Sequence, residues 1–322
     1  MLKTATLLLA AAVVVPISGQ VRSAPMPGNE GIQSGPPLSY HVIPDWAQLP
    51  AGWNFEEVAA VDVDKDDNVW VYSRGPHPVI QFDKSGKFLR SWPEPPRKRA
   101  HGIRVDADGN IWTVDVDAHR IIKWTPDGRV LMVFGLASGS AGDENSQYAF
   151  NLPANLTFAP NGDFFVADGY GNSRIVKFNK EGEFLAKWGK KGTGDGEFDL
   201  VHDVALDAQG RLYVADRNNR RVQIFDQNGK FIGKWTDLGQ PEGLYYVKSE
   251  NVIYMCDGGS GKDNEVHRII KVSLEGKVLG VLSEFGKTPG KLHVPHYLAV
   301  DSTGAIYVAE VRNWRVQKFV KN

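Results

Sequence analysis

The sequence predicts an all-β, six-bladed β-propeller, and three observations lead to this prediction. A pattern of strand, turn and strand occurs six times, and the residues that end its second strand lie roughly 40 to 53 residues apart. Such a period, with short strands and turns rich in Gly, Asn and Asp, is typical of propeller blades. β-branched and aromatic residues dominate the strands, as half-buried strands require. The chain also lacks any long stretch with helical periodicity.

Each repeat contributes an apolar first strand, a turn, a second strand that ends on an acidic or polar residue, and a third strand. The second strands are expected at residues 68–73, 110–115, 163–168, 211–216, 252–257 and 305–310. The third strands are expected at residues 79–82, 121–124, 175–178, 222–225, 269–272 and 316–319. An outer strand such as 184–188 comes next, except in the last repeat. We therefore expect residues 39–43 to pair into the last blade, which would remove a free sheet edge.

The remaining chain is expected to form a signal peptide over residues 1–24 and a flexible leader over 25–38, ahead of one propeller domain over 39–322. Lys3 followed by an apolar run is typical of a secretory signal, and the leader is rich in Pro and Gly. We expect export to the periplasm or the exterior, with no membrane span in the mature protein. The net charge of −1 argues against nucleic acid as a partner, and a single Cys256 rules out an internal disulfide.

One aligned position before the turn carries the candidate site. It is histidine in the second, fourth and sixth repeats: His101, His202 and His296. The other repeats have Ala59, Ala154 and Glu242 there. Alternate blades of a six-membered ring would bring the three imidazoles together around the axis. Three convergent imidazoles with an open fourth position describe a catalytic zinc site. A single histidine would more simply be a packed or solvated loop residue, but three in one register favour a metal site.

A second aligned position follows the residue that ends the second strand. It is arginine only in the first and fourth repeats, as Arg74 and Arg217. Several other arginines recur five or six residues after the strand end, where they are expected to pair with the acids: Arg120, Arg174, Arg221 and Arg315. Tyr170 lies between two glycines on the corresponding loop of the third repeat. These three side chains are expected to lie with the histidines at one mouth of the propeller's central funnel. The alternative interpretations are ordinary surface charge for the arginines and loop packing for Tyr170.

Segments 73–75, 101–112, 168–176, 215–217 and 295–296 occur in an order that resembles a known family. The family is that of the peptidyl-α-hydroxyglycine α-amidating lyases (peptidylamidoglycolate lyases), six-bladed propellers of NHL-type repeats, and the resemblance covers about residues 55–320. It implies zinc on His101, His202 and His296, with Tyr170, Arg74 and Arg217 as the catalytic and substrate-binding residues. It also implies a structural calcium on the carbonyl groups of Val61 and Ile103. Two features depart from the family: its calcium-binding aspartate is replaced by Tyr297, and Gly171 stands where the family has a disulfide cysteine.

The activity implied by the resemblance is cleavage of the C–N bond of an α-hydroxyglycine-type carbinolamide, which yields an amide and glyoxylate. Zinc would acidify the hydroxyl, and Tyr170 would take its proton if cationic neighbours lower the tyrosine pKa. An arginine offers a planar fork for the carboxylate. The substrate would be a peptide or small molecule with a terminal α-hydroxyglycine-like group, made by a separate monooxygenase.

Two alternatives stay open. One is a non-catalytic NHL-repeat platform for binding and interaction. The other is a calcium-dependent lactonase-like hydrolase, which the imidazole triad disfavours because calcium prefers oxygen ligands.

Overall fold

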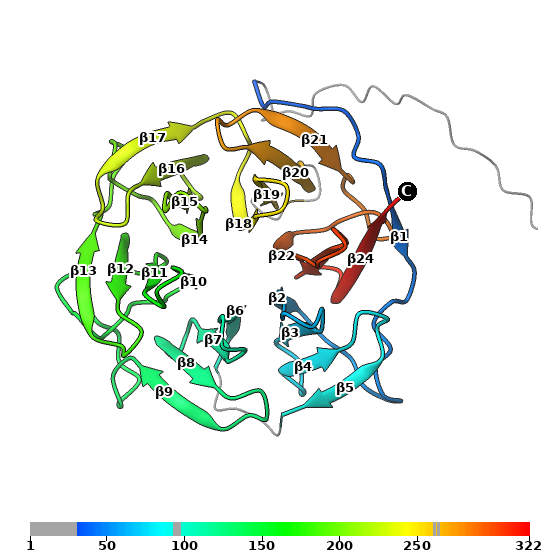
Figure 1. Ribbon diagram of the computed structural model, residues 1–322, viewed down its shortest axis with the longest axis horizontal. Helices are drawn as coiled ribbons and strands as arrows, with labels where there is room; N and C mark the ends of the chain where they lie inside the picture. Colours follow the sequence, from blue (N-terminus) through cyan, green and yellow to red (C-terminus); the bar gives the residue numbers. More distant parts are fainter. Residues whose placement is uncertain (1–30, 93–97, 260–261, 263–264) are drawn as a thin grey trace, which may run out of the picture.

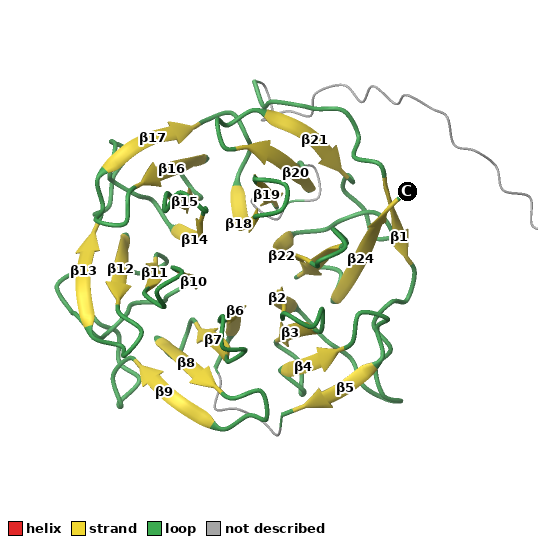
Figure 2. Ribbon diagram, in the orientation of Figure 1, coloured by secondary structure: helices red, strands yellow, loops and turns green. Residues whose placement is uncertain are grey.

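The computed structural model describes residues 31–92, 98–259, 262 and 265–322, and the expected signal peptide lies outside these ranges. The described chain forms 24 strands in six four-stranded antiparallel sheets. Figure 1 shows the sheets arranged as a ring, and Figure 2 shows that strands and loops make up all of it. The predicted six-bladed propeller is therefore confirmed. Within the described ranges, no helical segment has the length and apolarity needed to cross a bilayer.

Each blade runs from an inner strand near the axis to an outer strand at the rim (Figure 1). The first blade consists of β2 (Val58–Val63), β3 (Val69–Ser73), β4 (Val79–Phe82) and β5 (Phe88–Ser91). The second consists of β6 (Ala100–Val105), β7 (Ile111–Asp115), β8 (Arg120–Trp124) and β9 (Val130–Phe134). The third consists of β10 (Asn155–Phe158), β11 (Phe164–Asp168), β12 (Arg174–Phe178) and β13 (Phe184–Trp188).

The other three blades repeat this order. The fourth consists of β14 (Val201–Leu206), β15 (Leu212–Asp216), β16 (Arg221–Phe225) and β17 (Phe231–Trp235). The fifth consists of β18 (Pro241–Val247), β19 (Val252–Asp257), β20 (Arg268–Ser273) and β21 (Val278–Leu282). The sixth consists of β22 (Pro295–Val300), β23 (Ile306–Glu310), β24 (Arg315–Lys321) and the N-terminal β1 (Tyr40–Ile43).

The N-terminal strand closes the ring as predicted. β1 pairs antiparallel with β24, with Tyr40 opposite Lys321 and Ile43 opposite Lys318. The pairing satisfies backbone groups that would otherwise form an open sheet edge. Part of the expected leader also contacts the propeller, because the backbone N–H of Leu38 donates to the carbonyl of Val281 at 2.8 Å.

The recurring acids hold the turns of the blades. The turn aspartate accepts a hydrogen bond from the Trp or Tyr of the next strand at 3.0–3.1 Å in four blades: Asp64 from Trp70, Asp106 from Trp112, Asp207 from Tyr213 and Asp301 from Tyr307. The acid that ends the second strand pairs with the expected arginine in three blades: Asp168 with Arg174, Asp216 with Arg221 and Glu310 with Arg315. Arg120 departs from the expectation and donates to the carbonyl of Leu136 at 3.5 Å.

The two kinds of loop that carry the candidate site residues lie at the same end of each blade. The backbone N–H of Arg217 donates to the carbonyl of Leu200, at 3.0 Å, and that of Val311 donates to the carbonyl of Val294, at 3.2 Å. Arg74 makes the same contact with the carbonyl of Glu57, at 2.8 Å. The loop after each second strand is thereby tied to the loop before the inner strand, which brings both aligned positions to one mouth of the ring.

Candidate metal centre

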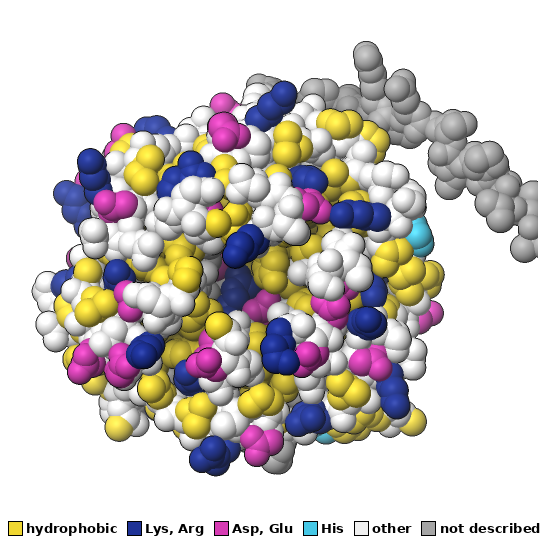
Figure 3. Space-filling view, in the orientation of Figure 1, with side chains coloured by type: hydrophobic (Ala, Val, Ile, Leu, Met, Phe, Trp, Pro, Cys, Tyr) yellow, Lys and Arg dark blue, Asp and Glu magenta, His cyan; other side chains and the backbone are white. Residues whose placement is uncertain are grey.

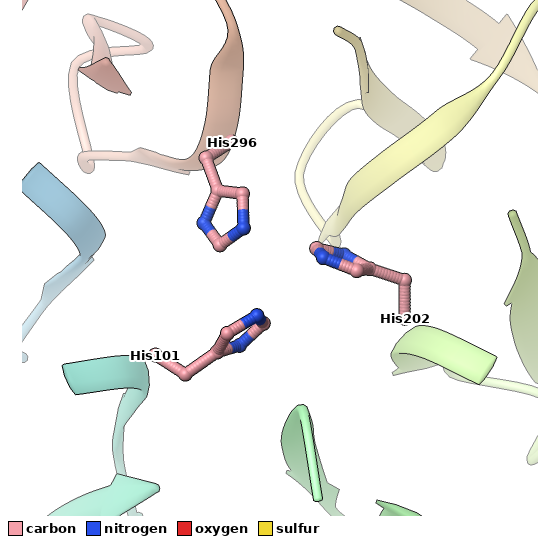
Figure 4. A group of neighbouring side chains, drawn as sticks. All are labelled: His101, His202 and His296. Atoms are coloured by element: carbon pink, nitrogen blue, oxygen red, sulfur yellow. The ribbon is translucent and has the colours of Figure 1, made fainter. Parts of the chain in front are cut away.

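Three buried imidazoles meet at the axis of the propeller. His101, His202 and His296 project from β6, β14 and β22, and their rings point toward one another (Figure 4). One ring nitrogen of each lies within 4.8 Å of the others. The ring centroids are 4.7 to 5.0 Å apart. The structure thus brings together the three histidines that share one register in alternate repeats.

Backbone carbonyls of the intervening blades orient all three imidazoles. The Nδ1 atoms of His101, His202 and His296 lie 2.8, 2.8 and 2.6 Å from the carbonyl oxygens of Ala154, Glu242 and Ala59, respectively. These carbonyls belong to the same aligned position in the third, fifth and first blades. A carbonyl can only accept, so each Nδ1 carries the proton and each Nε2 keeps a lone pair. Such an outer contact sets the tautomer that a metal ligand needs.

Local backbone features make these contacts possible. Gly102 packs so closely on the third blade that a Cβ there would lie 2.8 Å from the Ala154 carbonyl oxygen. Two residues before His202 and His296, Leu200 and Val294 adopt positive φ angles of 69° and 53°. Bulky residues rarely hold this conformation, and it is found most often where surrounding contacts enforce it, as at functional sites. These residues directly precede β14 and β22, in each of which the histidine is the second residue.

Burial keeps the imidazoles neutral. It lowers the pKa of His296 to about 3, and nearby arginines act in the same direction. Burial is also the main cause that holds the pKa values of His101 and His202 well below their usual range. Neutral imidazole is the form that binds a metal ion.

The three nitrogens fit a zinc ion. Zn–N bonds of about 2.0–2.1 Å in tetrahedral geometry place ligand nitrogens about 3.3 Å apart. The observed spread of up to 4.8 Å would need only a small inward movement of the rings. Three neutral imidazoles on a fixed tautomer match the protein donor set of a catalytic zinc site.

The Tyr170 hydroxyl lies directly at this centre. Its oxygen is 3.1 Å from Nε2 of His101 and 2.9 Å from Nε2 of His202. Gly169 makes this position possible, because any Cβ there would collide with the backbone of Val201, next to His202. The close approach that the flanking glycine predicts is therefore present.

Burial and the neighbouring arginines act in opposite directions on the pKa of Tyr170. Burial raises its pKa to about 12, with Glu242 acting in the same direction. Arg217, Arg99 and Arg74 lower the pKa, but by less than burial raises it. Without a metal ion, the three arginines therefore do not offset the removal of the hydroxyl from water.

Both candidate arginines have acidic partners. Arg217 Nε lies 2.9 Å from Glu242 Oε1, and its Nη1 lies 3.5 Å from the Tyr170 hydroxyl. Arg74 forms an ion pair through Nη1 with Glu57, and its Nε donates to the carbonyl of Ala100 at 3.2 Å. Figure 3 shows one face of the ring, with basic and acidic side chains meeting in its central hollow. Each of the two expected arginines thus forms an ion pair. The Arg217 pair lies beside Tyr170, and the Arg74 pair lies beside β6, the strand that carries His101.

Glu242 is the site residue that sequence reasoning did not single out. It is 1% exposed, and its Oε2 lies 3.2 Å from Nε2 of His202. Burial raises its pKa to about 7, although Arg217 opposes the shift. A signal was present in the sequence, because Glu242 occupies the aligned position that holds the small residues Ala59 and Ala154 elsewhere.

The residues do not fit the implied calcium. The buried Tyr297 hydroxyl donates to the carbonyl of His202 at 2.8 Å, so it is engaged by the protein. The carboxylate of Asp203 is bound by the guanidinium of Arg104, whose Cζ also lies 5.7 Å from the centre of the Tyr297 ring. The backbone carbonyls of Val61 and Ile103 therefore have no acidic side chain at position 297 to complete a calcium site.

Comparison with known proteins agrees with the fold and the resemblance. A model of the NHL repeat matches residues 150–178 and 198–225, in the third and fourth blades. The chain is similar to NHL repeat-containing protein 3 of Homo sapiens, with 30% identity over 207 residues, which cover 56% of this chain and 53% of that protein. The chain is a six-bladed β-propeller in which the third and fourth blades match the NHL repeat.

More particularly, part of the chain is similar to a protein named as an amidating lyase. It is 31% identical over 207 residues to peptidyl-alpha-hydroxyglycine alpha-amidating lyase 1 of Drosophila melanogaster, covering 58% of this chain and 38% of that protein. The chain thus spans about half or less of the length of these curated relatives. Among solved structures, a streptogramin B lyase superposes with a TM-score of 0.62 at 15% identity, over 88% of this chain and 98% of that one. At that identity the likeness shows the fold alone.

Proposed function

We propose that this protein is a zinc-dependent carbon–nitrogen lyase that splits a terminal α-hydroxyglycine-type carbinolamide into an amide and glyoxylate. The observation that carries the proposal is the position of the Tyr170 hydroxyl, within 3.1 Å of the Nε2 atoms of two of the three convergent imidazoles. Relatives that bear the name of amidating lyases support it. His101, His202 and His296 would hold the metal, which when bound would acidify a coordinated hydroxyl.

The reaction moves one proton from oxygen to nitrogen. The carbinol hydroxyl loses its proton, the electron pair of the O–H bond forms the aldehyde C=O, and the C–N bond electrons go to the amide nitrogen. Tyr170 is the side chain placed to carry the proton. Its hydroxyl lies 3.1 and 2.9 Å from the Nε2 atoms of His101 and His202, where it can both give and receive a proton. Tyr170 would give its own proton to the departing nitrogen and receive the hydroxyl proton, so no net charge stays on the ring.

The arginines would bind the carboxylate end of the substrate. Arg217 meets Glu242 through its Nε edge, so its terminal nitrogens face other groups, including the Tyr170 hydroxyl. A guanidinium held by one edge can present the planar fork of its other edge to a carboxylate. Arg74 is held differently, since its Nε donates to the carbonyl of Ala100 and its Nη1 pairs with Glu57, so it would act on the carboxylate mainly through its charge.

Elemental analysis of the purified protein, combined with an assay of glyoxylate release from α-hydroxyhippurate, tests the proposal. We expect about one zinc per chain and release that stops when a strong chelator removes the metal. The second candidate is a binding platform without catalysis, because the chain is about as similar to NHL repeat-containing protein 3, whose name states no activity. Metal-free protein, or zinc-loaded protein without glyoxylate release, would favour that platform. We expect export to the periplasm or the exterior in either case, because residues 1–24 have the pattern of a signal peptide.

A further inference from the structure

Glu242 on β18 places a carboxylate inside the candidate metal centre. The residue is 1% exposed, and neither carboxylate oxygen has a hydrogen-bond partner among the described residues. A buried acceptor without a partner loses its hydrogen bonds to water and gains none in return, and the cost is larger if the group is charged. Such a group in a folded protein needs a reason. At a binding site, the simplest reason is a ligand that supplies the missing donor.

Arg217 neutralises this carboxylate without occupying its lone pairs. Arg217 Nε lies 2.9 Å from Glu242 Oε1, but that nitrogen also lacks an aligned hydrogen-bond partner among the described residues. The two side chains are close enough for an ion pair and misaligned for a hydrogen bond. The ion pair offsets the cost of burying the charge, and the acceptor capacity of Glu242 is kept for another molecule.

The second oxygen faces the metal-binding side of His202. The carbonyl of Glu242 accepts the Nδ1 proton of His202 at 2.8 Å, so Nε2 carries a lone pair. Glu242 Oε2 lies 3.2 Å from that same Nε2. Two acceptors repel at this distance unless a cation or a donor lies between or beside them. Any donor held next to Nε2 would therefore be within reach of Oε2.

We propose that Glu242 is a substrate-contacting residue whose Oε2 accepts a hydrogen bond from the carbinol hydroxyl of the bound substrate, before that proton moves to Tyr170. The inference takes its substrate from the proposed function and adds the group that recognises the hydroxyl. It makes the site selective for ligands that carry a free hydroxyl next to a carboxylate, because an ether oxygen at the same place has no hydrogen to donate.

Calorimetric titration of the zinc-loaded full chain with two inert ligands tests this inference. The ligands are 2-hydroxy-3-phenylpropanoate and 2-methoxy-3-phenylpropanoate, and neither has a C–N bond to cleave. The quantity of interest is the ratio of their dissociation constants. Glu242→Met keeps the length of the side chain and removes the acceptor. Glu57→Met is the matched control, because it removes the carboxylate partner of Arg74 instead.

We expect Glu242→Met to reduce the preference for the hydroxyl ligand by at least about 10-fold, the effect of one hydrogen bond to a charged group. Glu57→Met should leave the ratio unchanged. The steric effect of the ligand's methyl group is the same in the wild type and the variant. A change at Arg217 affects both ligands. Both effects therefore cancel when the ratios are compared. Should Glu242→Met fail to fold, Glu242→Gln replaces it, and a smaller reduction is expected because the amide oxygen still accepts.

An unchanged ratio in the Glu242 variant overturns the inference. So does a loss of zinc from that variant by elemental analysis, since Glu242 would then be a metal ligand. Glyoxylate release by the wild type separates this outcome from the proposed function. A Glu242-dependent ratio without glyoxylate release supports the recognition role and refutes the lyase. Glyoxylate release with an unchanged ratio supports the lyase and refutes the recognition role of Glu242.

Discussion

Arg104 and Asp203 form a buried ion pair across the ring, with Nη2 3.0 Å from Oδ2. Arg104 belongs to the second blade and Asp203 to the fourth. Asn155 of the third blade donates to the same carboxylate at 2.8 Å, and the backbone N–H of Leu244 in the fifth does so at 2.7 Å. One carboxylate thereby ties four blades together beside His202, with a guanidinium as its cation.

We expect this internal pair to make the protein independent of calcium. The thermal midpoint of the wild type should not change when calcium or a calcium-selective chelator is added. Arg104→Met should lower the free energy of unfolding by about 3–5 kcal/mol, because Asp203 is left buried without a cation. Lys234→Met is the control, since its pair with Asp195 is exposed and should contribute at most about 1 kcal/mol. A calcium-dependent rise in the wild-type midpoint would contradict this prediction.

The histidines provide a prediction on metal content. We expect His202→Ala to lose most of its zinc and glyoxylate release, because two imidazoles hold the ion poorly. His41→Ala should retain both, since the His41 side chain is exposed and its imidazole hydrogen-bonds to Asn322. Metal analysis after gel filtration makes the comparison. Full zinc retention in His202→Ala and in His296→Ala would rule out the proposed centre.

Tyr170 is expected to act on the chemical step. Tyr170→Phe removes the hydroxyl and keeps the ring, so zinc content and thermal midpoint should stay close to wild type. The value of kcat should fall by at least about 100-fold, the usual contribution of a proton-transferring group. Tyr148→Phe is a suitable control, because Tyr148 is an exposed loop residue. If Tyr170→Phe turns over α-hydroxyhippurate at nearly the wild-type rate, another group moves the proton.

The arginines are expected to act mainly on substrate carboxylate binding. Arg74→Ala and Arg217→Ala should each lower kcat/KM by 10-fold or more, an estimate based on about 1.5–3 kcal/mol for a charged hydrogen bond. Substrates whose carboxylate is replaced by a carboxamide should respond far less to these changes. Wild-type kinetics in both variants would show that the two arginines are ordinary surface charges.

The depressed histidine pKa values predict acid sensitivity of the metal-free protein. The pKa of His296 falls from 6.5 to about 3 on burial, so the folded state binds fewer protons than the unfolded state between these values. The free energy of unfolding should therefore decrease as pH falls from about 6.5 toward 3. His296→Asn should show a shallower decrease in urea titrations across this window. Equal slopes for the two proteins would exclude His296 as a source of the acid sensitivity.

The repeats could be predicted because each blade is specified locally. Strands rich in β-branched and aromatic residues recur six times, with a turn aspartate in four repeats and an acid at the strand end in five, so the period alone indicates a propeller. The aligned register of His101, His202 and His296 follows from the same repetition. Ring closure by β1 was also predictable, because the last repeat lacks its own outer strand and an unpaired edge is unfavourable.

The sequence by itself therefore determined the ring, its closure and the three histidines that share a register. Only the tertiary structure decided how charges are paired at the axis. Arg104 meets Asp203 although 99 residues separate them, and Arg217 meets Glu242 from the neighbouring blade. Such contacts depend on how far each strand reaches toward the axis and on side-chain direction. The pKa values of Tyr170 and Glu242 depend on them too, because removal from water competes there with charges contributed by different blades.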